Sequence, residues 1–317
     1  FERNPLYWND KETVINSATF LAIENPSTDV ARYRAGDLDM TNYGLPPEQF
    51  AKLQKELPGE VYITRTLATY SYELNNKKAP FDNVNVRKAL NLSLDRNVIT
   101  DKVLGQGQTP TYVFTPTYIE EGQLIQQPAY SKEPMAQRNE EAIKLLEEAG
   151  YSKANPLKFT ILYNTNENHK KVAIAAASMW KANTKGLIDV KLENQEWKTY
   201  IDSRRAGRYD AARAGWNADY NQATTFGNYF LSNSSNNTAK YANPEYDKAI
   251  AESYVATDAE GRAKAYAKAE EILAKDFGIV PIFNYVNPRL VKPYVKGYSG
   301  KDPQDHIYLR NLYIIKH

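Results

Sequence analysis

The chain has 317 residues, 42% of them hydrophobic, which is enough for a sizeable core in two domains or in one large one. Its 40 basic and 38 acidic side chains nearly cancel, so the charge gives little support for binding to nucleic acid or to a membrane surface. The absence of cysteine excludes disulfides, thiol catalysis and cysteine-ligated metal sites, and no apolar run approaches the roughly 20 residues that span a bilayer.

The first half of the chain is predicted to alternate between strands and helices. Apolar residues at every second position predict strands, and apolar residues at i, i+3, i+4 and i+7 predict helices. The clearest helix, at 135–149, is followed by Gly150, a residue that often terminates helices in the left-handed conformation. The other elements expected here are a strand at 18–24, a helix at 47–56, strands at 59–66 and 68–75, and a helix at 84–104.

The second half continues this alternation. A helix is expected to begin at the capping box Thr257-Asp-Ala-Glu260 and to run to Leu273. The other elements expected are strands at 157–163, 188–194, 209–216, 279–286 and 307–315, and helices at 169–184, 197–206 and 244–254. Apolar strands that flank helices are typical of crossover connections, so we predict an α/β or α+β fold with a partly parallel sheet.

The sequence lacks the common catalytic and metal-binding signatures. It contains no His-Glu-x-x-His, no Gly-x-Ser-x-Gly, no phosphate-binding glycine-rich loop and no EF-hand loop. Its three histidines, His169, His306 and His317, are far apart along the chain, and a multi-histidine metal site would need all of them to converge. We therefore expect no metal, no cofactor and no catalysed reaction.

The segment from Arg213 to Asp219 has the most unusual composition. Small residues precede and follow Arg213, and small residues at the edge of a strand let a second extended backbone approach and exchange main-chain hydrogen bonds. The carboxylate of Asp219 can then pair with the α-ammonium of a peptide, while Arg213, Arg204 or His169 takes its carboxylate. Two alternatives remain open: Arg213 and Asp219 pair with each other within a loop, or Asp219 belongs to a hydrolase, for which no positioned nucleophile or base is evident.

Two segments carry a resemblance to a known family: Tyr209-Asp-Ala-Ala-Arg-Ala-Gly-Trp-Asn-Ala-Asp-Tyr-Asn221 and Leu231-Ser-Asn-Ser-Ser-Asn-Asn-Thr238. They resemble the oligopeptide-binding proteins that serve ABC peptide importers in Gram-negative bacteria, within family 5 of the bacterial extracellular solute-binding proteins. The likeness extends over essentially the whole chain. Further similar segments are Glu2-Arg-Asn-Pro-Leu-Tyr-Trp8, Arg32-Tyr-Arg-Ala-Gly-Asp-Leu-Asp39, Tyr72-Glu-Leu-Asn-Asn76, Asn194-Gln-Glu-Trp197 and Leu290-Val-Lys-Pro293.

This resemblance implies a periplasmic-binding-protein-like fold of class II, cluster C, with two lobes that close over an extended peptide. Residues 1–67 would belong to the larger lobe, 68–287 would form the second lobe with most peptide contacts, and 288–317 would return to the larger lobe. Such a protein captures oligopeptides in the periplasm, largely independently of their side chains, and delivers them to an ABC permease in the inner membrane. Nucleic acid is not an expected partner.

The resemblance also implies roles for individual residues. Asp219 would bind the peptide's α-amino group, and Arg213 and His169 would neutralise C-terminal carboxylates of peptides of different length. Trp216 and Trp197 would line side-chain pockets, and Glu73 with Arg204 would frame another. The remaining candidates are Ala214, Gly215, Asn217 and Tyr285.

Two departures from the family pattern bear on this interpretation. Relatives commonly carry a disulfide between cysteines at the positions of Ala68 and Asn217, and both cysteines are absent here. Relatives also have an N-terminal region before Phe1, with part of the larger lobe and a small extra subdomain, so we expect this part to be missing or to act as a separate chain. A murein tripeptide-binding relative and a haem- or glutathione-binding sister protein remain alternatives.

Overall fold

The structure is a computed structural model that describes residues 1–23, 25–42 and 44–316. These residues divide into two compact units. The larger unit consists of Leu67–Leu104 and Thr109–Tyr285, and the smaller one of Phe1–Thr66, Gly105–Gln108 and the chain from Val286 onward.

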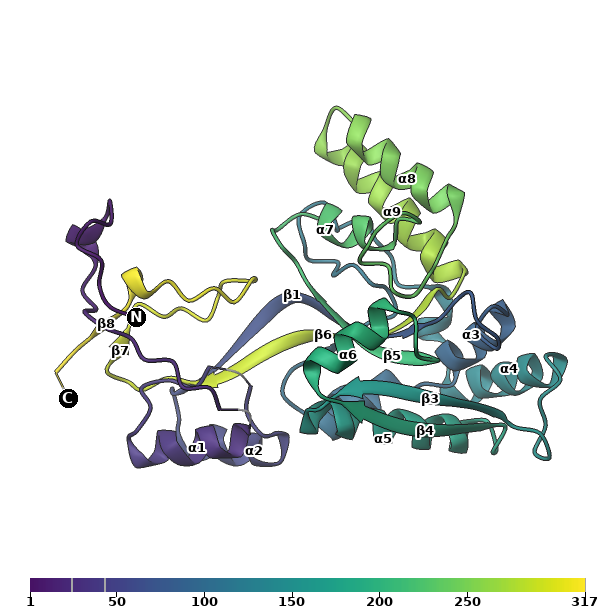
Figure 1. The fold of residues 1–317 in the computed structure, drawn as a ribbon, viewed down its shortest axis with the longest axis horizontal. Helices are drawn as coiled ribbons and strands as arrows, with labels where there is room; N and C mark the ends of the chain where they lie inside the picture. The colour runs from purple at the N-terminus through teal and green to yellow at the C-terminus, as the bar shows by residue number, and fades with distance from the viewer. Residues whose placement is uncertain (24, 43, 317) are drawn as a thin grey trace. The chain divides into compact units, whose positions relative to one another are not determined.

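A six-stranded mixed sheet organises the larger unit (Figure 1), with the strand order β2-β6-β1-β5-β3-β4. β3 pairs in parallel with β4 and β5, whereas β1 pairs antiparallel with β5, and β2 with β6. The predicted mixed fold with a partly parallel sheet is therefore confirmed. The strands are β1 (Val61–Leu74), β2 (Thr109–Pro110), β3 (Leu157–Asn164), β4 (Ile188–Gln195), β5 (Ala211–Asn217) and β6 (Ile279–Leu290).

Two helices flank the parallel part of this sheet (Figure 1). α5 (Glu167–Asn183) lies on one side of β3 and β4 and makes the crossover between them that parallel strands require. Its Val172, Ala176 and Trp180 are buried in the main core cluster, and the indole of Trp180 donates a hydrogen bond to the Leu90 carbonyl (2.9 Å). α6 (Trp197–Arg205) lies on the other side and leads from β4 into β5. This arrangement places the end of α6 directly before the segment singled out in the sequence.

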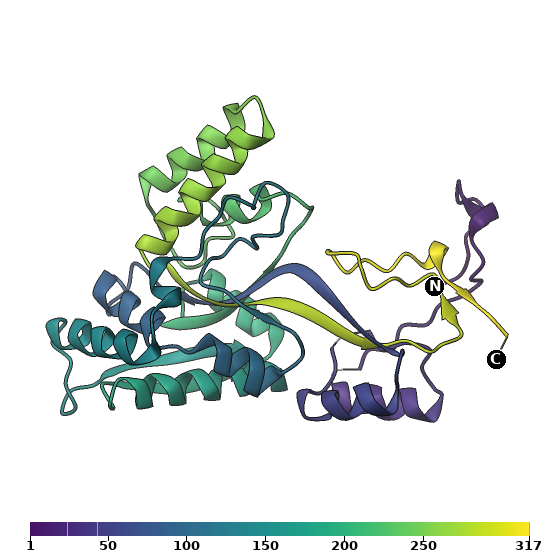
Figure 2. The ribbon, with the colours of Figure 1, turned by 180° about the vertical axis from the view of Figure 1, so that it is seen from behind.

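The remaining helices of the larger unit complete its cores. α8 (Pro244–Val255) and α9 (Ala259–Lys275) lie side by side as a hairpin (Figures 1 and 2), and Tyr246 and Tyr266 are among their residues in a second core cluster. The others are α3 (Val84–Leu92), a π-helical segment (Val98–Leu104), α4 (Met135–Glu148) and α7 (Thr224–Gly227), with 3-10 turns at Ala129–Lys132 and Asn228–Phe230.

The smaller unit has a core of its own. α1 (Pro26–Ala35) and α2 (Pro47–Glu56) bury Tyr33 and Leu53 in a cluster that also includes Leu45. Its other elements are β7 (Val295–Lys296), β8 (Tyr313–Ile314) and 3-10 turns at Asp10–Glu12 and Leu309–Asn311.

Most of the predicted helices are confirmed within two residues at each end, but two details are wrong. The N-cap of α9 is Asp258, which accepts from the Gly261 amide (2.7 Å), so the capping box predicted at Thr257 and Glu260 does not form. The helix predicted at 84–104 ends at Leu92. It is interrupted because the Asp95 carboxylate accepts from the amide of Asn97 (3.0 Å), which starts a separate helical segment.

The strand predictions differ from the structure mainly at the ends of the chain. The strands predicted at 59–66 and 68–75 are one strand, β1, and β6 continues beyond 286 to Leu290. No strand forms at 18–23, where Phe20 and Leu21 are exposed without a paired strand, and residue 24 lies outside the described residues. Of the strand predicted at 307–315, only Tyr313–Ile314 pairs, with β7. The sequence analysis missed α1, α7, β2 and β7.

Candidate functional site

β5 has one edge that is paired along its whole length and one that is not. On the β1 side, every residue of β5 has a partner, from Ala211 opposite Leu74 to Asn217 opposite Ala68. On the β3 side, pairing stops at Ala212, opposite Leu162. The bridge at Ala212 uses the amide of Arg213, because the backbone groups of Ala212 itself point toward β1. Within the part of the chain that the structure describes, the edge from the Arg213 carbonyl to Asn217 therefore has no strand beside it.

The hydrogen bonds at both ends of the β1–β5 ladder show which backbone groups point toward this edge. The Ala218 amide donates to the Leu67 carbonyl (2.8 Å), and the Asn75 amide donates to the Asp210 carbonyl (3.1 Å). Hydrogen-bonded and non-hydrogen-bonded pairs alternate in an antiparallel ladder. The amide and carbonyl of Gly215 consequently point away from β1, and those of Arg213 and Asn217 do so as well.

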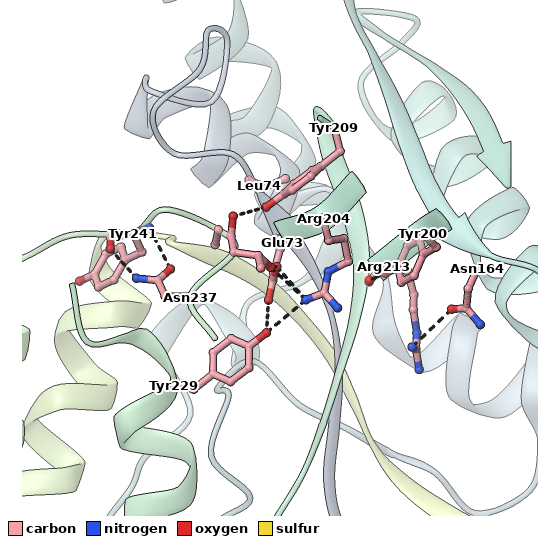
Figure 3. Close-up of polar contacts among 12 residues, drawn as sticks. Glu73, Leu74, Asn164, Tyr200, Arg204, Tyr209, Arg213, Tyr229, Asn237 and Tyr241 are labelled. Carbon is pink, nitrogen blue, oxygen red and sulfur yellow. Dashed lines mark hydrogen bonds and ion pairs between the residues drawn. The ribbon is translucent and has the colours of Figure 1, made fainter. Parts of the chain in front are cut away.

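Arg213 and Gly215 are in close contact at this edge. The nearly buried guanidinium of Arg213 donates from Nη2 to the Tyr285 hydroxyl (2.5 Å) and from Nη1 to Oδ1 of Asn164 (3.5 Å; Figure 3). A Cβ atom added to Gly215 would lie 2.9 Å from Nη2 of Arg213 and 3.0 Å from the Tyr285 hydroxyl. Glycine at 215 therefore leaves the space in which Arg213 and Tyr285 meet.

His169 belongs to the same group of side chains. It lies in the first turn of α5, where Asn166 caps the helix and accepts from the His169 amide (3.1 Å). The ring centroids of His169 and Tyr70 are 5.6 Å apart. The guanidinium carbon of Arg213 lies 5.2 Å from the ring centroid of Tyr70. Burial, and then the charge of Arg213, lower the pKa of His169 well below its ordinary value, so His169 is neutral at pH 7. The structure thus brings both candidate carboxylate-binding residues together.

Asp219 and Trp216 share a partner just beyond the other end of β5. Asp219 is exposed. Its Oδ2 accepts a hydrogen bond from the Thr225 hydroxyl (3.2 Å), and this hydroxyl in turn accepts one from the Asp219 amide (3.2 Å). The half-buried indole of Trp216 donates to the Thr225 carbonyl (2.9 Å) and packs edge-on against Tyr229, with 4.8 Å between ring centroids. Thr225 therefore fixes both the carboxylate and the indole, and Asn217 between them is exposed.

Glu73 and Arg204 form a buried ion pair (Figure 3). Oε2 of Glu73 lies 3.0 Å from Nη2 of Arg204, and the Glu73 carboxylate also accepts from the hydroxyls of Tyr229 (2.5 Å) and Thr238. Burial disfavours the charge of Arg204, but the adjacent Glu73 carboxylate, together with Tyr200 and Tyr229, outweighs this effect and keeps the pKa of Arg204 well above its ordinary value. The structure therefore brings these two candidates together in a buried network, away from Arg213 and His169, in which Nε of Arg204 has no hydrogen-bond partner among the described residues.

Trp197 lies at the first position of α6 and is 54% exposed. Its ring stacks on that of Tyr200, one turn later, with centroids 5.9 Å apart. Tyr200 is fully buried, and its hydroxyl donates to the Arg213 carbonyl.

Sequence reasoning missed several residues of the site, namely Tyr70, Asn164, Tyr200 and Thr225. Tyr200 had a signal: it follows Trp197 by three residues and precedes Arg204 by four, so all three share one helix face. Thr225 had none, because its role depends on how the chain turns back after Asp219.

The described residues contain no group of three or more His, Asp or Glu side chains placed to hold a metal ion, and His317 lies outside them. None of the helices found in the described residues combines the length and the apolar character needed to cross a membrane.

Comparison with known proteins gives one consistent result. The family model described as bacterial extracellular solute-binding proteins, family 5, middle, matches residues 1–238. The chain is 96% identical to the periplasmic oligopeptide-binding protein OppA of Haemophilus influenzae over 317 residues, and 54% identical to the protein of that name from Salmonella typhimurium over 316 residues. All of the chain aligns in both cases, but it spans only 59% and 58% of the length of these relatives.

The similarity extends to solved structures. The crystal structure of Haemophilus influenzae OppA in complex with RPPGFSPFR superposes with a TM-score of 0.95 at 96% identity, over 99% of this chain and 61% of that one.

Proposed function

We propose that this chain, which belongs to family 5 of the bacterial extracellular solute-binding proteins, forms one wall of a site that binds short peptides in an extended conformation. The observation that carries the proposal is the edge of β5 from Arg213 to Asn217, which has no neighbouring strand among the described residues and has small residues beside it. The relative that shares 96% of the sequence is named an oligopeptide-binding protein, and its structure contains RPPGFSPFR.

The backbone of β5 would hold the peptide without reading its side chains. The amide and carbonyl of Gly215 point toward the uncovered edge and are available in geometry for pairing with an extended ligand. Ala214 and Gly215 add almost no side-chain bulk there. Main-chain hydrogen bonds of this kind are common to all peptides, which accounts for tolerance of sequence.

The two ends of the peptide would be recognised by charge. Asp219, beyond the C-terminal end of β5, is placed to accept from an α-ammonium, and a charge-assisted hydrogen bond of this kind contributes about 1.5–3 kcal/mol. Arg213 lies at the other end of the edge, where its charge would take a C-terminal carboxylate. His169 lies close by and is neutral at pH 7, so it would take the carboxylate of a peptide of different length as a hydrogen-bond donor. The ligand would therefore run antiparallel to β5.

Side-chain contacts would come from the aromatic and polar residues around this edge. Trp216 and the exposed Trp197 present flat surfaces, and Asn217 and the hydroxyl of Tyr285 present polar groups. The Glu73–Arg204 pair, which is buried beside Tyr229 and Thr238, would frame a further pocket. Ordered water would complete the hydrogen bonds of varied ligand side chains.

We further propose that the larger unit is the second lobe of a periplasmic protein that delivers peptides to an ABC permease, without a catalysed reaction. The smaller unit exposes large apolar side chains, with Phe1, Leu6 and Trp8 all more than 80% exposed. Such exposure favours a covering partner, and we propose that the N-terminal part of the relatives covers these side chains.

Isothermal titration calorimetry tests this function. The chain, with and without the N-terminal part supplied in trans, is titrated with free tri- to pentapeptides, haem and glutathione. Of these three kinds of ligand, we expect only the peptides to give heat of binding. A response to haem or glutathione without a response to peptides would contradict the proposal. Mass spectrometry of the recovered peptides distinguishes binding from hydrolysis, because cleaved peptide would show an enzyme.

A further inference from the structure

The first carbonyl on the uncovered edge of β5, that of Arg213, already accepts a hydrogen bond from Tyr200. The hydroxyl of Tyr200 donates to the backbone carbonyl oxygen of Arg213, and both residues are labelled in Figure 3. The alternation of the β1–β5 ladder directs this carbonyl away from β1, toward the side on which an added strand would pair. The hydroxyl therefore uses one of the two acceptor sites of this carbonyl, on the side from which the amide of an added strand would approach.

The side chain of Tyr200 is held firmly in this position. It is fully buried, its ring lies under that of Trp197, and the guanidinium carbon of Arg204 is 5.7 Å from its ring centroid. Ile201 and the buried Tyr209 pack in the same small cluster. The Tyr200 hydroxyl is therefore held at the Arg213 carbonyl. Gly215 and Asn217 lie further along β5, where this hydroxyl does not extend.

We propose that Tyr200 determines where strand pairing with the peptide stops, and thereby fixes the register of the ligand. This inference rests on the proposed peptide-binding function. In an antiparallel ligand, alternate residues would face Asn217, Gly215 and Arg213, in that order from the N-terminus. Because the Tyr200 hydroxyl already donates to the Arg213 carbonyl, on the side from which a ligand amide would approach, main-chain recognition ends at the ligand residue that faces Gly215. The rest of the peptide leaves the edge, so its length and sequence are less restricted.

The experiment scans the main-chain hydrogen bonds of the ligand. Hexa-alanine is N-methylated at one amide at a time, and each peptide is titrated into the parent chain, into Tyr200→Leu and into Tyr246→Leu. Leucine at 200 keeps an apolar side chain in the core but does not reach the Arg213 carbonyl. Tyr246 is a matched control, because it too is buried and donates to a backbone carbonyl, that of Gly227 (2.7 Å), in α8 rather than at β5.

In the parent chain we expect methylation to weaken binding about threefold to tenfold at the amide that faces Gly215, and to have no effect two residues further toward the C-terminus. In Tyr200→Leu that second amide should become sensitive by a similar factor, since it now pairs with Arg213. Tyr246→Leu should keep the parent profile, even if both variants lose stability, because a loss of stability alone does not create a new sensitive position.

Two results would overturn the inference while leaving peptide binding intact: sensitivity at the second amide already in the parent chain, or identical profiles for the parent and Tyr200→Leu. The parent scan alone decides the first of these, so the test does not depend on whether Tyr200→Leu folds. A chain that binds hexa-alanine with no position sensitive to methylation, or does not bind it, contradicts the proposed pairing with β5 itself.

Discussion

Ala68 lies directly opposite Asn217 in the antiparallel pairing of β1 with β5. They form a non-hydrogen-bonded pair, because the next pair, Leu67 and Ala218, is hydrogen-bonded (2.8 Å). The Cα atoms of such a pair are about 4.5 Å apart, which suits a disulfide. These are the positions at which the family resemblance implies a cysteine pair. Their loss therefore removes a cross-link between two strands that remain paired by other means.

Replacing both residues, Ala68→Cys with Asn217→Cys, should restore this cross-link. We expect a disulfide to form in air and to raise the free energy of unfolding by about 2–4 kcal/mol, because it closes a long loop in the unfolded chain. Guanidinium unfolding with and without dithiothreitol measures the difference. The pair Ala68→Cys with Ala214→Cys, three residues out of register, should stay reduced; equal stabilisation by both pairs would contradict the register.

Asp219→Asn tests the recognition of the α-ammonium. The substitution removes the negative charge but keeps an oxygen for the Thr225 hydroxyl, which lies 3.2 Å from Asp219 Oδ2. We expect at least a tenfold loss of affinity for free peptides, about 1.4 kcal/mol, measured by calorimetry. N-acetylated peptides carry no α-ammonium, so the parent chain and the variant should bind them equally. Equal losses for free and acetylated peptides would refute the contact.

Local sequence signals predicted most of the longer helices and strands, but they missed α1, α7, β2 and β7. The crossover from β3 through α5 to β4 follows from apolar periodicity, because its strands and helix are each buried on defined faces. The interruption after Leu92 was missed because the Asp95 carboxylate competes for backbone amides in a sequence that otherwise favours a helix. The strand expected at 18–24 failed for a different reason: apolar residues there have no strand to pair with.

The candidate site was accessible from the sequence only in part. The small residues before Asp219 indicated an edge that another backbone can approach, and the structure has such an edge beyond Ala212. Periodicity gave no sign that Glu73 and Arg204 meet, because they are 131 positions apart and the order of strands brings them together. Only the family resemblance placed them at one pocket. The closure of the edge by Tyr200 likewise depends on how α6 packs against β5.

Gly215→Ala tests the close approach of Arg213 and Tyr285. The added Cβ would meet Nη2 of Arg213 at 2.9 Å and displace the end of a flexible side chain, so we expect less than about 1 kcal/mol of lost stability. The substitution moves the guanidinium of Arg213 and adds a methyl group to the edge that we propose binds the peptide. We therefore expect the peptide affinity, measured by calorimetry, to fall about tenfold. Adding Tyr285→Phe, which removes the second close atom, should recover part of this loss. No recovery would argue against the steric explanation.

His169 predicts a pH dependence of stability. Burial, and then the charge of Arg213, lower its pKa in the folded chain well below the ordinary value of about 6.5. Between these two values the unfolded chain binds a proton that the folded chain does not. Stability contributed by neutral His169 is therefore complete above pH 6.5 and decreases as the pH falls below it, by up to about 1.4 kcal/mol per pH unit.

Urea unfolding from pH 5 to 8 measures this slope. His169→Gln should flatten it below pH 6.5, whereas His306→Gln, which removes a histidine whose side chain is 51% exposed, should leave it as in the parent chain. A parent slope that survives His169→Gln would show that other groups cause it.

The buried pair of Glu73 and Arg204 predicts strong coupling between the two positions. Glu73→Leu would leave the guanidinium of Arg204 buried without its carboxylate, and the hydroxyls of Tyr229 and Thr238 without their acceptor. We expect a loss of about 3–5 kcal/mol in the free energy of unfolding, since removing one partner of a buried ion pair leaves an uncompensated charge. Arg204→Met should be similarly costly. The double variant should lose clearly less than the sum of the two, because an apolar pair of similar volume requires no counter-charge. Denaturant unfolding of the four proteins closes the cycle, and additive losses would show that the two charges do not stabilise each other.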